Sequence, residues 1–269
     1  MPQATAQEAL VLREDHGSVA HVTMNRPGAR NALSMDLMTA LRAAFATLSE
    51  DGDIAAIVLS GAPPAFCAGH DLKEMTQARA GADKGAAFFE ATFGAAAGLM
   101  QAIVNCPKPV IAAVEGIATA AGCQLVASCD LAIAGRASRF ATPCVNIGLF
   151  CSTPMVALSR NVPRKAAMEM LLHGHMIDAE KAREWGLVNA VTDNGEALAT
   201  ALDWAGEIAA KSPLTVRIGK EAFYRQLEMP LADAYLYTAD VMTRNMLAED
   251  AEEGIDAFLT KRKAEWRGR

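Results

Sequence analysis

Four short apolar runs with almost no charge recur along the chain, and they constrain its fold more than any other feature. They are "IAAIVLSG" (54–61), "PVIAAVEG" (109–116), "LAIAG" (131–135) and "GLVNAVT" (186–192), and helical patterns separate them. A strand that is apolar at every position has both faces covered, which is typical of parallel sheets flanked by helices. The sequence therefore predicts an α/β fold with parallel strand pairing.

The N-terminal part adds a strand, a loop and a well-marked helix. "SVAHVTMN" (18–25) has the composition of a strand, and the loop "RPGARNAL" (26–33) follows it. Ser34 is expected to cap a helix, because its hydroxyl can accept a hydrogen bond from an unpaired N–H of the first turn. The apolar positions of that helix follow a helical period: Leu37, Met38, Leu41, Phe45 and Leu48.

Strand-like runs stop near Asn194, and the remainder has the pattern of helices. We expect a core over residues 1–200 that carries the functional site. A helical C-terminal module is expected over residues 201–269. Its four candidate helices are "GEALATALDWAGEIAA", "PLTVRIGKEAFYRQ", "ADAYLYTADVMTRNML" and "EEGIDAFLTKRKAEW".

The net charge and the N-terminal residues indicate which partners and which cellular compartment to expect. The net charge is −6 with no dense block of one sign, which disfavours nucleic acid or an anionic membrane as the main partner. The first fifteen residues lack the basic and apolar regions of a signal peptide, so a cytoplasmic location is expected, or the mitochondrial matrix for a processed chain. Residues 140–159 are uncharged, but their Pro, Asn, Thr and Gly content predicts a buried core segment instead of a membrane span.

The cysteines and histidines show no metal-binding or redox spacing. The six cysteines form no C-x-x-C pair and have mostly apolar neighbours, which predicts small buried side chains in a reducing compartment. The "HGH" at 173–175 follows a helical pattern and is interpreted as a turn. No metal site is expected.

Two loops have the composition of a ligand site. "LSGAPPAFCAGHDLKEM" (59–75) and "VEGIATAAGCQLVASCD" (114–130) each leave a buried strand and enter a helix through small residues. Backbone N–H groups at a helix start lack helical partners, and Ala and Gly allow a ligand to approach them. Two such loops could direct two N–H donors at one oxygen and stabilise an oxyanion or enolate. The alternative is that the small residues serve only tight packing of helix on sheet.

These motifs resemble a known family. "NRPGARNALS", "AFCAGHDLKEM", "AVEGIATAAGCQLVASCDLAIA" and "RFATPCVNIGLF", in this order and spacing, are similar to the enoyl-CoA hydratase/isomerase (crotonase) superfamily. Within it, the sequence most resembles the group named enoyl-CoA hydratase domain-containing protein 3. The resemblance implies a spiral of strand–strand–helix repeats and a C-terminal helical module. It also implies a homotrimer or a dimer of trimers, and an acyl-CoA thioester as ligand with no separate cofactor.

The resemblance further implies roles for particular residues. Ala68 and Ala121 would supply the backbone N–H groups of an oxyanion hole. His70 lies inside the first motif, where a lining or capping role and a role as acid or base both remain open, and Asp71 is expected to cap the next helix. The residues expected to bind the substrate or its CoA moiety are Ala29, Ala68, His70, Asp71, Leu72, Ala121, Phe258 and Lys261.

Gln124 and Cys144 fall where hydratases of the family have glutamates. An amide exchanges no proton at usable pH, whereas a thiol could act as a base only if its pKa were lowered. Ordinary hydration is therefore in doubt, and isomerisation, thioester hydrolysis or another acyl-CoA reaction stays open. Glu115 is a further candidate acid. The rival interpretation is a non-catalytic acyl-CoA-binding or regulatory protein, and RNA binding is disfavoured by the acidic balance.

Overall fold

A computed structural model describes residues 9–269 of the chain, so the first eight of the fifteen N-terminal residues discussed above lie outside it. The main sheet has the strand order β1-β2-β3-β4-β6-β9. All neighbours in it pair in parallel except β1 and β2. The strands are β1 (Val11–His16), β2 (Val19–Met24), β3 (Ala56–Gly61), β4 (Val110–Val114), β6 (Leu131–Gly135) and β9 (Ala190–Thr192).

The five parallel strands coincide with the predicted runs, which confirms the α/β class. β3 and β4 are almost wholly buried, as their uncharged sequences require. The sequence interpretation missed β1, because "VLREDH" is rich in charge. β1 is an edge strand with mostly exposed side chains, and charged residues are well tolerated at such an edge.

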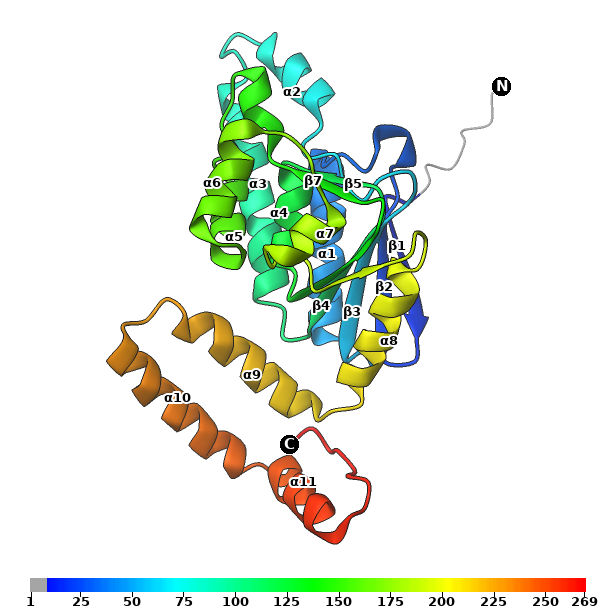
Figure 1. The fold of residues 1–269 in the computed structure, drawn as a ribbon, viewed down its shortest axis with the longest axis vertical. Helices are drawn as coiled ribbons and strands as arrows, with labels where there is room; N and C mark the ends of the chain where they lie inside the picture. The colour runs from blue at the N-terminus through cyan, green and yellow to red at the C-terminus, as the bar shows by residue number, and fades with distance from the viewer. Residues whose placement is uncertain (1–8) are drawn as a thin grey trace.

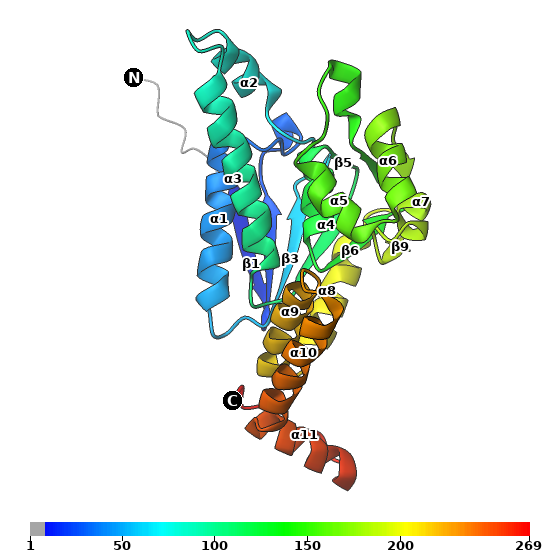
Figure 2. The same cartoon turned by 90° about the vertical axis from the view of Figure 1, so that its left-hand side faces the viewer.

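Helices cover both faces of this sheet (Figure 1 and Figure 2). α1 (Met35–Glu50) and α3 (Ala86–Val104) pack together on one face. The Ser34 hydroxyl accepts a hydrogen bond from the Leu37 N–H at 3.2 Å, which confirms the predicted cap. All five predicted apolar positions of α1 are buried.

α8 (Ala197–Ala209) covers the opposite face. Its residues Ala197, Ala201 and Ala205 are fully buried and belong to a second core cluster with Val58 and Ile111 of the sheet. Small side chains let this helix lie close to the strands. The predicted boundary after residue 200 falls inside α8, so the helices that extend from the body begin after this helix.

The C-terminal region consists of three helices that project away from the body (Figure 1 and Figure 2). They are α9 (Pro213–Gln226), α10 (Leu231–Met246) and α11 (Glu249–Thr260), and α9 packs against α10. Their existence agrees with the predicted helical patterns. α11 ends at Thr260, earlier than "EEGIDAFLTKRKAEW" suggested, and Lys261 caps it with a left-handed φ of 58°.

A second, three-stranded sheet lies beside the main one and contains β5 (Ile117–Thr119), β7 (Arg139–Ala141) and β8 (Ile177–Asp178). Cys67 forms a parallel bridge to Ala118 of β5, so the first small-residue loop runs alongside the second. The remaining helices connect these parts: η1 (Pro27–Ala29), α2 (Leu72–Arg79), α4 (Ala121–Ser128), η2 (Pro143–Ile147), α5 (Pro154–Asn161), α6 (Arg164–His173) and α7 (Ala179–Glu184).

Residues 140–159 are not a uniformly buried segment, which corrects the sequence interpretation. Phe140 and Thr142 are fully buried, but Ile147, Leu149 and Phe150 are largely exposed. The chain leaves β7 here, and the short η2 helix carries it to the surface. The "HGH" at 173–175 lies where α6 ends: His173 is the last helical residue, and the chain turns at Gly174, which has a left-handed φ of 63°.

One helix of the described chain, α3, is long and apolar enough to cross a membrane by length and composition. Its residues Leu99 and Ile103 belong to the main hydrophobic core together with residues of α1. Helices that pack on the core of a protein can meet the same test, and α3 packs on the core and on α1.

Candidate functional site

The two small-residue loops and the N-terminal loop meet at one place. The Leu33 N–H donates to the Gly69 carbonyl at 2.8 Å, and the Asp71 N–H donates to Leu33 at 3.1 Å. On the other side, the Cys67 N–H donates to the Ile117 carbonyl and the Thr119 N–H donates to the Cys67 carbonyl, each at 3.0 Å, so the first loop pairs with β5. The start of α2 and the start of α4 are therefore held next to each other.

The backbone N–H groups of these loops differ in whether they already donate a hydrogen bond within the protein. The Ala68 N–H donates to the Arg30 carbonyl at 3.0 Å, so a contact from Ala68 to a ligand would require that bond to break. Within residues 9–269, the N–H groups of His70 and Ala121 donate to no protein acceptor. A Cβ added to Gly69 would lie 3.6 Å from the Ala121 nitrogen, so the two loops approach closely here. His70 and Ala121 thus present the free amides.

The entry into α4 is strained. Ala120 has φ 51° and ψ −116°, a conformation that glycine adopts far more readily than alanine. Gly69 opposite has φ 92°, and a Cβ there would lie 3.0 Å from the Ala120 Cβ. Strained backbone that a surrounding structure holds in place is common at binding sites. Here the strained residue directly precedes Ala121, whose N–H is free within the described residues.

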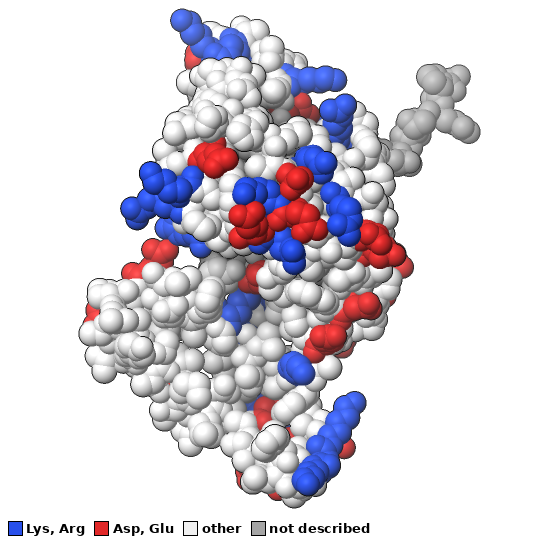
Figure 3. Space-filling view, in the orientation of Figure 1, with Lys and Arg blue, Asp and Glu red and all other residues white. Residues whose placement is uncertain are grey.

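Gln124 occupies the next turn of α4 and is buried, with 5 % of its surface exposed. Its Oε1 has no hydrogen-bond partner within the described residues. The residue also lines a cavity of about 1090 Å³ between the body and α9, together with Val156 and Phe223. Figure 3 shows the surface hollowed between the body and the C-terminal helices. A buried amide oxygen without a partner is costly unless a ligand or water satisfies it.

Cys144 is joined to Cys151 by a disulfide, with the Cα atoms 5.4 Å apart. This corrects the expectation of six free thiols, and it removes the Cys144 thiol as a base in the oxidised protein. The other four cysteines are free and buried, as predicted. Burial raises the pKa of the Cys123 thiol to about 12, so that residue stays protonated at neutral pH.

His70 and Thr142 are two further polar side chains without partners. Burial lowers the pKa of His70 to about 4, and neither ring nitrogen forms a hydrogen bond within residues 9–269. The ring packs edge-on to Phe93 with centroids 5.5 Å apart. The Thr142 hydroxyl, fully buried, is also unpaired. Sequence reasoning missed Thr142, since nothing local shows that a threonine hydroxyl will be buried alone.

Asp71 and Glu115 have structural partners. Asp71 caps α2 by accepting from the Lys73 N–H at 3.0 Å, as predicted, and pairs with Arg26 at 3.0 Å. Burial opposes its ionisation, but the hydrogen bonds from Arg26 and the backbone still lower the pKa of Asp71. Glu115 accepts from the Gly195 and Ala197 N–H groups at the start of α8. Its place at that helix start excludes the role of a displaced acid in this site.

The other residues expected to bind CoA are spread over two regions. Ala29 ends η1 beside the first loop, and Leu72 begins α2 with an exposed side chain. Phe258 and Lys261 lie on the C-terminal helices, where both are exposed. A role for these two in the same site stays a prediction that requires a neighbouring copy of the chain.

Comparison with known proteins agrees with this architecture. The family model described as enoyl-CoA hydratase/isomerase matches residues 14–269. The mouse protein named enoyl-CoA hydratase domain-containing protein 3, mitochondrial, is 41 % identical over 97 % of this chain and 85 % of its own length. The human protein of that name is 43 % identical over 92 % of this chain and 80 % of its own length.

Solved structures give the same result. The crystal structure of an enoyl-CoA hydratase from Mycobacterium smegmatis superposes with a TM-score of 0.91 at 48 % identity, covering 96 % of this chain and 99 % of that one. Human enoyl-CoA hydratase domain-containing protein 3 superposes with a TM-score of 0.91 at 41 % identity, covering 96 % and 100 %. The resemblance of the four motifs is thereby confirmed, and so is the crotonase fold. The chain belongs to the enoyl-CoA hydratase/isomerase family.

Proposed function

We propose that the protein binds an acyl-CoA thioester and stabilises the enolate form of its acyl group. The observation that carries this proposal is the pair of free backbone amides, His70 and Ala121, at the adjoining starts of α2 and α4. Family membership supports an acyl-CoA ligand. The pair replaces the one expected from the sequence, because the Ala68 amide is bonded to Arg30.

The two amides would donate to the thioester carbonyl oxygen. When a proton leaves the α-carbon, negative charge builds up on that oxygen. The fixed N–H donors therefore stabilise the transition state more than the ground state. Removing one such donor typically lowers the rate about 10²–10³-fold. Ala29 and Leu72 would line the CoA moiety, with Asp71 holding the loop through Arg26. Phe258 and Lys261 of a neighbouring copy would reach its adenine end, where lysine favours phosphate.

Proton transfer is where this chain differs from a hydratase. Gln124 cannot ionise, and in the oxidised protein Cys144 has no thiol. His70 is neutral at pH 7 and a weak base, given its pKa of about 4. We therefore expect little hydration of enoyl-CoA. These groups leave open a reaction in which the two amides polarise the thioester carbonyl. The proton from the α-carbon would then be transferred by another group of the substrate or by a bound water molecule.

A second candidate function is acyl-CoA binding without turnover, for example in a regulatory protein. The disulfide supports it, because Cys144 then offers no acid or base at a position where hydratases have a glutamate. Both candidates need the same two amides. They differ only in whether bond changes follow binding.

Oligomerisation and location are part of the same proposal. The helices after α8 expose many large apolar side chains, which favours a homotrimer or a dimer of trimers. They include Leu231, Tyr235, Leu236, Met242, Leu247, Phe258 and Leu259. The vertebrate relatives are named mitochondrial. We propose the cytoplasm or, for a processed chain, the mitochondrial matrix. Because cytosolic thiols are kept reduced, the Cys144–Cys151 disulfide removes Cys144 as an acid or base in the oxidised form of the protein alone.

The test is a panel of saturated, 2-enoyl, 3-enoyl and 3-hydroxyacyl-CoA thioesters, each incubated with purified protein and followed by mass spectrometry and calorimetry. Turnover of any member supports the enzyme, whereas tight binding without turnover supports the binding protein. Ala121→Pro removes one donor N–H at the first position of α4, and its ring also restricts the conformation of the preceding Ala120, which has φ 51° and ψ −116°. It should weaken thioester binding while leaving free CoA binding in place, and a thermal melt checks folding. If no acyl-CoA binds the unmodified protein at millimolar concentration, the proposal is wrong.

A further inference from the structure

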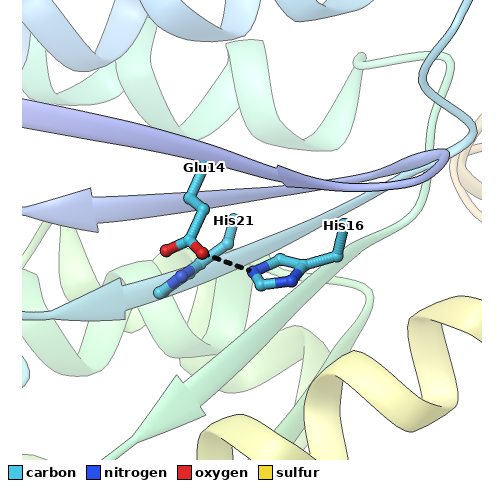
Figure 4. Close-up of side chains that lie close together, drawn as sticks. All are labelled: Glu14, His16 and His21. Carbon is cyan, nitrogen blue, oxygen red and sulfur yellow. Dashed lines mark ion pairs between the residues drawn. The ribbon is translucent and has the colours of Figure 1, made fainter.

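Three possible metal ligands lie on one side of the β1–β2 hairpin, away from the acyl-CoA site. Glu14 and His16 are two residues apart on β1, so their side chains point to the same face of the strand. His21 is the cross-strand partner of Glu14 on β2. Figure 4 shows the three side chains close together on that face. One ligand atom from each of them lies within 4.8 Å of the others.

We propose that Glu14, His16 and His21 form a binding site for a divalent transition metal ion, with zinc as the best match. Two imidazoles and one carboxylate are ligands that zinc accepts, at about 2.0–2.2 Å. In a tetrahedral site, ligand atoms at such distances are about 3.4 Å apart. The ligand atoms of the present cluster, which lie within 4.8 Å of one another, would therefore have to move slightly closer together to bind an ion.

The two outer ligands are free to make that closure. The side chains of His16 and Glu14 are 42 % and 72 % exposed, and the His16 Nε2 already lies 3.7 Å from Glu14 Oε1. Because both side chains are largely exposed, the His16 ring and the Glu14 carboxylate can turn toward His21. The His16 and His21 ring centroids are 6.3 Å apart, which leaves room for an ion between them.

The inner ligand, His21, is held in a fixed orientation. It is 8 % exposed, and its Nε2 lies 2.8 Å from the Ser60 Oγ and 3.1 Å from the Thr23 Oγ1. If Nε2 carries the proton and donates to one of these hydroxyls, Nδ1 keeps a lone pair for a metal. Partners that orient the second ring nitrogen are a usual feature of metal-binding histidines. This tautomer would make His21 the anchor of the site.

The bound ion would join the edge strand to the sheet. β1 pairs only with β2, so its outer side has no strand partner within residues 9–269. An ion held by Glu14 and His16 on one side and His21 on the other would cross-link the hairpin near its turn. Three protein ligands leave one tetrahedral position for water. This role is structural and independent of the proposed acyl-CoA chemistry.

Zinc titration of the metal-free full-length protein by calorimetry tests the site. We expect one zinc ion per chain, a rise in melting temperature with zinc, and visible absorption typical of tetrahedral coordination when cobalt(II) is added instead. His16→Asn and Glu14→Gln alter only exposed side chains, so they should fold normally and each weaken zinc binding at least tenfold. His21→Gln should abolish it.

The matched control is the other histidine pair of the chain. His173 and His175 are exposed on either side of Gly174 at the end of α6, with ring centroids 5.2 Å apart. The variant with both changed to Asn should bind zinc as the unmodified protein does. The proposal is overturned if the unmodified protein binds no zinc, or if binding is lost in this control and kept in His16→Asn. Acyl-CoA binding should be the same with and without zinc.

Discussion

The ammonium group of Lys220 lies 2.7 Å from Oδ2 of Asp130, and this ion pair ties α9 to the end of the sheet. Lys220 also donates to the carbonyls of Ile103 and Lys108, and the Tyr224 hydroxyl donates to the other carboxylate oxygen at 2.9 Å. Both charged side chains are mostly buried, at 7 % and 17 % exposure. The link fixes the base of the helical region and one wall of the cavity that Gln124 lines.

Lys220→Met should therefore destabilise the protein strongly. The change leaves the Asp130 carboxylate buried without its counter-charge, and breaking a buried pair in this way costs about 3–5 kcal/mol. Urea unfolding followed by circular dichroism measures the loss. Glu228→Gln is the control, because it removes an exposed pair with Arg160 and should leave the free energy of unfolding almost unchanged. Equal effects of the two changes would contradict the structure.

Ala120→Gly should stabilise the protein by about 1 kcal/mol, because it relieves a left-handed conformation that costs alanine more than glycine. Ala127→Gly in the same helix α4 is the matched control. It should destabilise by about 1 kcal/mol or more, since its backbone is helical and glycine is unfavourable there. A lower melting temperature for Ala120→Gly would show that the methyl group contributes packing that outweighs the strain.

His70 should make the fold sensitive to acid. Burial lowers its pKa from 6.5 to about 4, so between these pH values the unfolded chain binds a proton that the folded protein does not. The contribution of His70 to the free energy of unfolding is therefore complete above pH 6.5. It decreases as the pH falls from 6.5 to 4 and does not change further below pH 4. The loss between pH 7 and pH 4 is about 3 kcal/mol. His70→Gln should lose correspondingly less stability over this range. Equal slopes for both proteins would contradict this prediction.

Restoring two glutamates should create hydratase activity where there is little. Gln124→Glu combined with Cys144→Glu should hydrate crotonyl-CoA faster than either single change, because the two groups act together and each acid–base step is worth about 10²–10⁴-fold. Cys144→Ser is the control for losing the disulfide alone. Glutamate is larger than cysteine, so a thermal melt must accompany the assay. Rapid hydration by the unmodified protein would show that other groups transfer the proton.

Leu236→Glu should disrupt the proposed trimer. Leu236 is 73 % exposed on α10, and the face of the C-terminal helices that Figure 3 shows carries little charge. Light scattering should give a trimer or larger for the unmodified protein and a smaller species for the variant. Leu172→Glu is the matched control, because Leu172 is also exposed but lies on α6 of the body. A monomer at micromolar concentration before any change would refute the proposed assembly.

Features with a strong local cause could be predicted from the sequence. The uncharged strands, the Ser34 cap and the Asp71 cap all follow from neighbouring residues, and the structure has each of them. β1 was missed because an edge strand needs no apolar pattern. The close packing of α8 on the sheet was missed as well, since its small alanine face became meaningful only with the strands in place.

The parts of the site that depend on distant contacts could not be predicted in the same way. Which amide of "AGHD" is free depends on Arg30, whose carbonyl takes the Ala68 N–H although it lies far away in sequence. The pairing of Cys144 with Cys151 depends on how η2 turns the chain back. The family resemblance pointed to two loops that the structure brings together, and the geometry was needed to show which of their amides are free.

The disulfide between Cys144 and Cys151 also affects how the protein must be assayed. Release of CoA is commonly followed with a reagent that reacts with any accessible thiol, and reductant is often added during purification. Protein reduced in this way would carry two new thiols at the η2 turn, and the reagent would count them as product. An apparent thioesterase burst proportional to protein and independent of acyl-CoA would then be the titration of these two cysteines. Mass spectrometry of the intact chain, which differs by two hydrogens between the forms, tells the two events apart.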